Sequence, residues 1–201
     1  MELLVGVVIG LIGIAYGIYS KREADKQSRG SMLGADEGPS LMVIRSEKGF
    51  NCCLHNTSSF PQFDLWVRIH EFAADKIIDT RVMGPAALND PIVALPDLYP
   101  NKAQLSPFYE IDLGTDHRVR VNFFIHARNA QSHAEVLAVR DGDEFKCAYK
   151  QWFAEGKEVV KVPDDFPARN REDPQSVFAE DEPTGKLYFK NKDGVLIEIP
   201  R

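Results

Sequence analysis

Residues 118–129 read RVRVNFFIHARN, and their side chains alternate with the period of two that is typical of a β-strand. One face carries Val119, Val121, Phe123, Ile125 and Ala127, and the other carries Arg118, Arg120, Asn122, Phe124, His126 and Arg128. Residues 62–72, QFDLWVRIHEF, repeat the pattern, with Phe63, Leu65, Val67 and Ile69 opposite Asp64, Trp66, Arg68 and His70. We therefore expect one face of each strand in a core and the other at the surface.

Further strand-like runs lie on both sides of these two, separated by turn-forming residues: LMVIRS, FNCCLHN, KIIDTRV, FYEIDLG, AEVLAVR, EFKCAYKQWF and EVVKV. We find no convincing amphipathic helix among them. The pattern predicts a mainly β protein, with an antiparallel β-sandwich of immunoglobulin-like or C2-like architecture over residues 41–163. Residues 88–105 contain three prolines and are expected to form an irregular crossover.

The C-terminal part divides into two segments. Residues 164–184 are expected to form a solvated, proline-containing linker, because positions 164–183 hold seven acidic residues against two arginines. Residues 185–201 then predict a β-hairpin, in which 186–190 pair with 195–199 and Gly194 takes a positive φ in the turn.

The N-terminal part predicts a membrane anchor. No charge occurs between Leu3 and Tyr19, and 17 helical residues span roughly 26 Å, close to the thickness of a thin bilayer core. We expect a transmembrane helix over residues 1–19 and a flexible linker over 20–40. The alternative is a signal peptide cleaved near Gly17, although the first residues, Met-Glu, lack the positive charge of such peptides.

Basic residues follow the apolar run and predict its orientation. An excess of Lys and Arg marks the cytoplasmic side of a span, which here carries Lys21, Arg22, Lys26 and Arg29. We therefore expect the folded domain in the cytoplasm. A single anchor followed by a small sandwich is the organisation that we expect of a bacterial inner-membrane protein.

Glycines form a stripe along the predicted helix. Their spacings of four, three and four residues place Gly6, Gly10, Gly13 and Gly17 on one face. Helices in lipid associate through close packing, which a groove without side chains permits. The stripe predicts association with a second copy or with a partner membrane protein, while the alternative is the general abundance of glycine in membrane helices.

Composition narrows the function classes. The net charge of −6 argues against nucleic-acid binding, which depends on clustered Lys and Arg. Three cysteines cannot form a complete disulfide framework within one chain. The chain also lacks the common phosphate-loop, dinucleotide, nucleophile-elbow and zinc-protease motifs, and we expect no cofactor.

Several residues are candidates for metal binding, catalysis or modification. His55, His70 and His126 lie near predicted strand ends and are weak candidates for a zinc site, since no closely spaced ligand pair accompanies them. Residues 141–144, DGDE, are better explained as a turn than as a calcium loop. Cys147 is expected to be a small core residue, and Asn56 begins a glycosylation sequon that a cytoplasmic domain would not use.

The face predicted to lie outside the core is the best candidate for partner binding. If the two alternating strands pair, they gather Trp66, Arg68, Arg120 and Phe124, which are residue types enriched at interface hot spots. The alternative is a second buried layer, covered by the terminal hairpin or by the 88–105 crossover.

The leading hypothesis is a membrane-anchored interaction or scaffold protein without enzymatic activity. The alternatives are a metal-dependent enzyme at the histidines and a lipid-contacting C2-like module.

Overall fold

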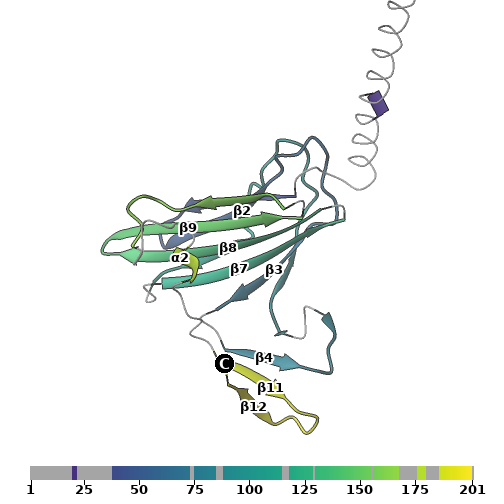
Figure 1. The fold of residues 1–201 in the computed structure, drawn as a ribbon, viewed down its shortest axis with the longest axis vertical. Coiled ribbons are helices and arrows are strands. Elements are labelled where there is room, and N and C mark those ends of the chain that lie inside the picture. The colour runs from purple at the N-terminus through teal and green to yellow at the C-terminus, as the bar shows by residue number, and fades with distance from the viewer. Residues whose placement is uncertain are drawn as a thin grey trace, which may run out of the picture.

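The computed structural model describes residues 20–21, 38–72, 75–84, 88–114, 118–128, 130–154, 156–167, 176–179 and 186–200. This part of the chain is built mainly of strands in three sheets, so the prediction of a mainly β protein is confirmed (Figure 1). The predicted anchor over 1–19, including all four glycines of the stripe, lies outside these residues. Within the described ranges, no helix is both long and apolar enough to cross a bilayer.

The first two sheets form the body of the molecule. The smaller one contains β1 (Ser40–Arg45), β2 (Gly49–His55) and β6 (Tyr109–Asp112), in the order β1-β2-β6. The larger one has the order β10-β9-β8-β7-β3-β5. Its strands are β3 (Trp66–Glu71), β5 (Ile92–Ala94), β7 (Arg118–Ala127), β8 (Ala130–Asp141), β9 (Glu144–Phe153) and β10 (Glu158–Lys161). All neighbours in both sheets are antiparallel.

One hydrophobic core joins these two sheets. Leu54 and Ile111 of the small sheet are buried together with Val67, Phe123 and Val136 of the large sheet. The alternation in 62–72 and 118–129 explains the arrangement, because every second side chain of β3 and β7 enters this core. The resulting two layers are sandwich-like, as the sequence predicts.

The chain joins this body through Gly38 and Pro39, both of which are buried. The Pro39 carbonyl accepts hydrogen bonds from Gln151 Nε2 (2.8 Å) and Ser132 Oγ (3.1 Å), and the Leu41 amide donates to Gln151 Oε1 (2.9 Å). The folded part therefore begins slightly before the predicted boundary at residue 41.

The third sheet departs from the prediction. It has the order β12-β11-β4, with β4 (Lys76–Asp79), β11 (Leu187–Lys190) and β12 (Leu196–Ile199). β11 and β12 form the C-terminal hairpin, while β4, which we expected in the sandwich, pairs in parallel with β11 instead (Figure 1). The Lys76 amide donates to the Lys186 carbonyl at 2.8 Å, and the Lys186 amide donates to Asp75 Oδ1 at 2.7 Å.

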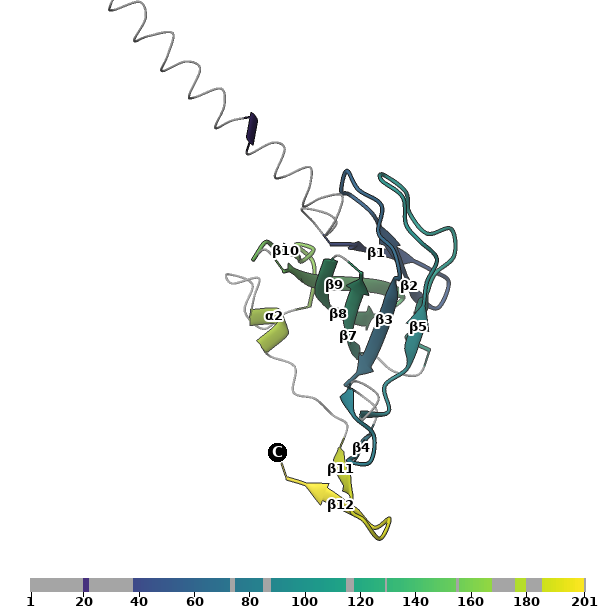
Figure 2. The ribbon, with the colours of Figure 1, turned by 90° about the vertical axis from the view of Figure 1, so that its right-hand side faces the viewer.

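A second, smaller core lies on the opposite face of the large sheet. Residues 164–184 were expected to be solvated, yet Phe166, Val177 and Phe178 are buried against Leu137, Val139 and Ala148. Val177 and Phe178 belong to the short helix α2 (Ser176–Ala179), which lies across the sheet from β1 and β2 (Figure 2). The physical reason is that the side chains on this face of β8 and β9 are apolar at one end of the strands. Burying them under the later segment removes apolar surface from water.

Candidate binding face on the six-stranded sheet

The face of the large sheet that turns away from the main core carries the candidate site. Strands β3 and β7 do pair, and their register sets Trp66 opposite His126 and Arg68 opposite Phe124. Across β7 and β8, Phe124 lies opposite His133, and across β8 and β9, His133 lies opposite Trp152. Four strands thus contribute one side chain each to a line across the sheet, here named the stacked row: Arg68, Phe124, His133 and Trp152.

Neighbours in the stacked row lie ring against ring. The guanidinium carbon of Arg68 is 4.0 Å from the ring centroid of Phe124. The Phe124 and His133 rings are 4.6 Å apart and nearly parallel, at 3°, and those of His133 and Trp152 are 4.9 Å apart at 19°. Stacked and cation–π pairs of this kind contribute about 0.5–1.5 kcal/mol each beyond simple burial.

A second stack lies beside the row. The Trp66 and His126 rings are 3.9 Å apart with an angle of 9° between their planes. At the other end of the row, Lys150 Nζ lies 4.6 Å from the Trp152 ring and 3.0 Å from Glu158 Oε1. The face therefore combines aromatic rings with cations, which is the composition of protein–protein hot spots.

Burial keeps two histidines of this face, His126 and His133, uncharged. Burial lowers the pKa of His133 and of His126, and the positive charge of Arg68 lowers both pKa values further. The ordinary histidine pKa is about 6.5, so both rings are neutral at pH 7. Arg68 is therefore the cation within the stacked row.

Three buried polar atoms on this face have no hydrogen-bond partner among the described residues: Arg68 Nε, Asn122 Oδ1 and His133 Nε2. Arg68 and His133 flank Phe124 in the row, and Asn122 precedes Phe124 by two residues on the same face. Buried polar atoms in folded proteins are nearly always bonded, so three such atoms around one ring set the surroundings of Phe124 apart from the rest of this face.

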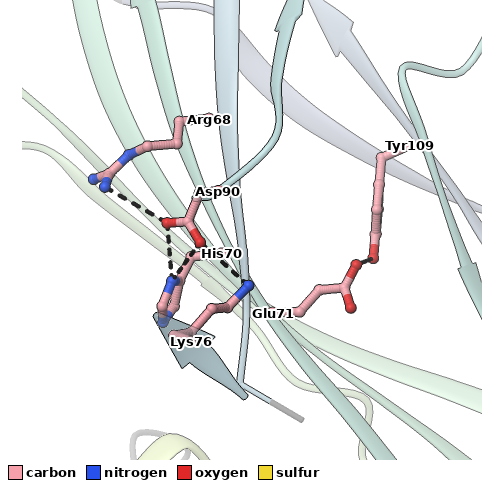
Figure 3. A network of polar contacts seen from close by, with 6 residues as sticks. All are labelled: Arg68, His70, Glu71, Lys76, Asp90 and Tyr109. Carbon is pink, nitrogen blue, oxygen red and sulfur yellow. Dashed lines mark hydrogen bonds and ion pairs between the residues drawn. The ribbon is translucent and has the colours of Figure 1, made fainter. Parts of the chain in front are cut away.

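A buried carboxylate orients the Arg68 end of the row. The side chain of Asp90 is 0% exposed and meets His70 Nδ1 at 3.0 Å, Lys76 Nζ at 3.2 Å and an Arg68 terminal nitrogen at 3.6 Å. Figure 3 shows the three partners converging on Asp90. Asp90 therefore ties the crossover to β3 and β4 and limits where the Arg68 guanidinium can lie.

A second contact in the same view joins the two layers. Tyr109 of β6 donates a hydrogen bond to the carboxylate of Glu71, at the end of β3 (Figure 3). Burial, followed by the hydrogen bond to Glu71, raises the pKa of Tyr109 well above its usual value. The tyrosine therefore remains a donor at neutral pH and links the small sheet to the large one.

The predicted partner-binding residues lie on one face. Trp66, Arg68 and Phe124 are direct neighbours, as the strand pairing brings them together. Arg120 lies four residues before Phe124 along β7, where it forms an ion pair with the buried Glu135 and stacks 4.8 Å from the Phe72 ring centroid. All four predicted side chains are half-buried.

The three candidate zinc ligands do not converge. His55 ends β2 in the small sheet, whereas His70 and His126 belong to the large sheet. His70 pairs with Asn122, four residues from His126 along β7, which separates the two histidines by roughly 13 Å. In the described part of the chain, no three His, Cys, Asp or Glu residues are grouped to hold a metal ion.

Three other sequence candidates have structural roles. Asp141 and Glu144 close the turn between β8 and β9, with Gly142 at φ 63°, and Asp141 pairs with Lys146 at 2.8 Å. Cys147 packs on the main core, and its burial raises its pKa to about 12. The sequon residue Asn56 is fully buried, so its amide is not accessible to a glycosylating enzyme.

Half of the stacked row could not be identified from the sequence. His133 directly precedes the predicted strand AEVLAVR, which is apolar on both faces over residues 136–139, so alternation does not assign the histidine to a side. The sequence places Trp152 in a predicted strand, but no signal in the neighbouring residues shows that it pairs with His133. Asp90 lies in a proline-rich stretch, far in sequence from its partners.

Comparison with protein-family models, curated protein sequences and solved structures gives no match for this chain.

Proposed function

We propose that this protein is a membrane-anchored interaction module whose β domain binds a polypeptide partner on the face that carries the stacked row. The observation that supports the proposal is the coincidence, around Phe124, of stacked rings, the Arg68 cation and three buried polar atoms without partners in the described structure. Aromatic and arginine side chains dominate the binding energy of protein interfaces.

The chemistry of the three polar atoms favours a polypeptide. Arg68 Nε is a donor, Asn122 Oδ1 is an acceptor, and the neutral His133 ring places either a proton or a lone pair at Nε2. A peptide backbone offers both N–H and C=O groups, and it satisfies such a mixed set when the side chains of the stacked row turn to expose these atoms. Apolar side chains of the same segment would pack on the rings of Trp66 and Trp152.

The membrane part of the proposal rests on the sequence. The uncharged run from Leu3 to Tyr19 anchors the chain, the basic residues after it place the domain in the cytoplasm of a bacterial cell, and the glycine stripe brings anchors together. We include in the proposal that the two layers are immunoglobulin-like or C2-like in architecture.

The experiment is site-specific photo-crosslinking in the native membrane. A photoreactive phenylalanine analogue replaces Trp66 or Trp152 in the full chain, and the matched control carries it at Ile44, an exposed position on β1 of the other sheet. We expect one discrete crosslinked protein from positions 66 and 152 and none from position 44.

Two results would contradict the proposal. The first is the absence of a discrete adduct from positions 66 and 152 in folded protein. The second is an adduct that persists unchanged when Arg68→Gln is added, provided that the melting temperature shows the variant to be folded. Retention of the full chain in membranes after alkaline extraction tests the anchor separately.

A further inference from the structure

The part of the 88–105 crossover that follows β5 exposes apolar side chains at one end of the body. Tyr99 is 59% exposed and Leu105 is 103% exposed, and both stand on the rim of a groove of about 580 Å³. The groove is lined mainly by apolar side chains, including Leu95, Leu98 and Phe108. Single exposed apolar residues are common, but two at the rim of an apolar groove indicate a contact surface.

These side chains lie at the end where the N-terminal segment joins the domain. Ser40, the first residue of β1, pairs with His55, and His55 forms a bridge with Ala103 of the crossover. Neighbouring strands are about 4.8 Å apart, so the crossover passes roughly 10 Å from the start of β1. Figure 2 shows the crossover reaching the end of the body where β1 begins.

Hydrogen bonds hold the exposed stretch of the crossover over residues 99–105, here named the arm, in place. The Lys102 amide closes a turn on the Tyr99 carbonyl at 3.1 Å, with Asn101 at φ 56° in its centre. Asn56 and the arm exchange two further bonds, from the Asn101 amide to the Asn56 carbonyl and from the Asn56 amide to the Lys102 carbonyl, each at 2.9 Å. Tyr99 and Leu105 are therefore held by a bonded arm before any contact is made. This lowers the conformational entropy that is lost on binding.

We propose that Tyr99, Lys102 and Leu105 form a second membrane contact, seated on the surface of the bilayer that holds the anchor. Leu105 enters the acyl boundary, Tyr99 takes the interfacial position that suits its ring and hydroxyl, and Lys102 lies among lipid phosphates. This inference rests on the anchor of the proposed function and adds an orientation to it.

The length of the connecting segment identifies the bilayer as the occupant. The sequence predicts a flexible linker between the predicted span and Gly38, and a flexible chain of the 18 residues at positions 20–37 averages roughly 24 Å from end to end. The domain therefore stays close to the bilayer, and the end that joins the segment is the nearest part of it. The tether supplies the high local concentration that a small contact needs.

Charge at this end of the body contributes little to the proposed membrane contact. Asp64 forms an ion pair with Arg128 at 2.6 Å, and Asp97 lines the same groove as Lys102. The attraction of Lys102 to anionic lipid is thus partly offset. Insertion of Leu105 and Tyr99 supplies most of the binding, and the contact should depend only weakly on lipid charge.

The test measures quenching of an added tryptophan by brominated lipid. Leu105→Trp in the full chain is reconstituted into nanodiscs of phosphatidylcholine, with or without bromine on the acyl-chain carbons nearest the headgroup. The matched control is Met83→Trp, at a position 92% exposed in the segment after β4. Emission of the parent protein, from Trp66 and Trp152, is subtracted.

We expect bromination to reduce the added emission of Leu105→Trp by about twofold or more and to leave that of Met83→Trp unchanged, because quenching requires contact with the acyl region. Equal quenching of the two variants, in protein that resists alkaline extraction, would overturn the membrane contact and leave the anchor intact. Protein that alkaline treatment releases would instead disprove the anchor, and this inference with it.

Discussion

Among single residues, Asn56 is the polar side chain that fastens the loop after β2 to the crossover. Its Nδ2 donates to the carbonyls of Phe60 (2.7 Å) and Leu98 (2.8 Å), and its Oδ1 accepts from the amide (2.9 Å) and hydroxyl (2.7 Å) of Ser58. Asn56→Ala removes these four bonds and takes the acceptor away from the buried Ser58 amide, so it should lower the free energy of unfolding by about 2–4 kcal/mol. Denaturant unfolding of the full chain in detergent measures this change.

The neighbouring Thr57 supplies the control for that experiment. Thr57 is exposed and hydrogen-bonds the Ser40 hydroxyl at 3.3 Å, so Thr57→Ala should change the stability by only about 0.5 kcal/mol. Equal effects of the two substitutions would show that the Asn56 bonds do not stabilise the loop.

His133 provides a prediction for pH dependence. Its pKa in the folded state is lowered, first by burial and then by Arg68, so below about pH 6.5 the unfolded chain binds more protons than the folded one. The stability from this group is complete above the unfolded pKa and is lost as the pH falls. His133→Phe keeps a ring in the stacked row and should flatten the acid-side loss, measured by unfolding between pH 5 and pH 7.5. An unchanged slope would show that His133 is not responsible for it.

Among the elements, α2 stabilises the face that it covers. Phe178 is buried against Leu137, Val139 and Ala148, so Phe178→Ala should destabilise this region by about 2–4 kcal/mol. Hydrogen exchange should become faster in α2 and remain slow in β7, which lies in the main core. The exposed substitution Met83→Ala should change neither region. Faster exchange throughout the body would mean that the second core is not a separate unit.

The C-terminal hairpin depends on the turn after β11. Gly194 has φ 82°, its amide donates to the Asn191 carbonyl at 3.0 Å, and Asn191 Oδ1 accepts from the amides of Asp193 and Val195. A β-branched residue does not tolerate this φ, so Gly194→Val should speed hydrogen exchange in β11, β12 and β4 while the body stays protected. Gly194→Asn is the matched control, because asparagine tolerates the left-handed region. Equal exchange in both variants would contradict this role of the turn.

For the whole molecule, the glycine stripe predicts association between anchors. Gly10→Leu together with Gly13→Leu fills the groove and should weaken self-association several-fold in a membrane two-hybrid assay of the full chain. Val8→Leu, on the opposite face of the predicted helix, is the control and should have no effect. An unchanged signal from the double variant would show that the glycines are not used for association.

Local sequence pattern was sufficient to predict the strands around Trp66 and Phe124, because alternation over a few residues assigns each side chain to a face. It also located the terminal hairpin, since the turn residues around Gly194 are adjacent in the chain. It was insufficient for Phe166, Val177 and Phe178, which lie among acidic residues and prolines that indicate solvent exposure. Their burial depends on the apolar outer face of β8 and β9, which no local signal near residue 177 reveals.

The sequence by itself determined that this is a mainly β protein, and it determined which side chains of β3 and β7 avoid the core. Only the tertiary structure decided that β4 leaves the body for the C-terminal hairpin, that Asp90 meets Arg68, His70 and Lys76, and that His133 and Trp152 complete the stacked row. The physical reason is the distance along the sequence between the residues that interact. Backbone alternation is set by neighbouring residues, whereas strand partners and register depend on contacts between segments far apart in the chain.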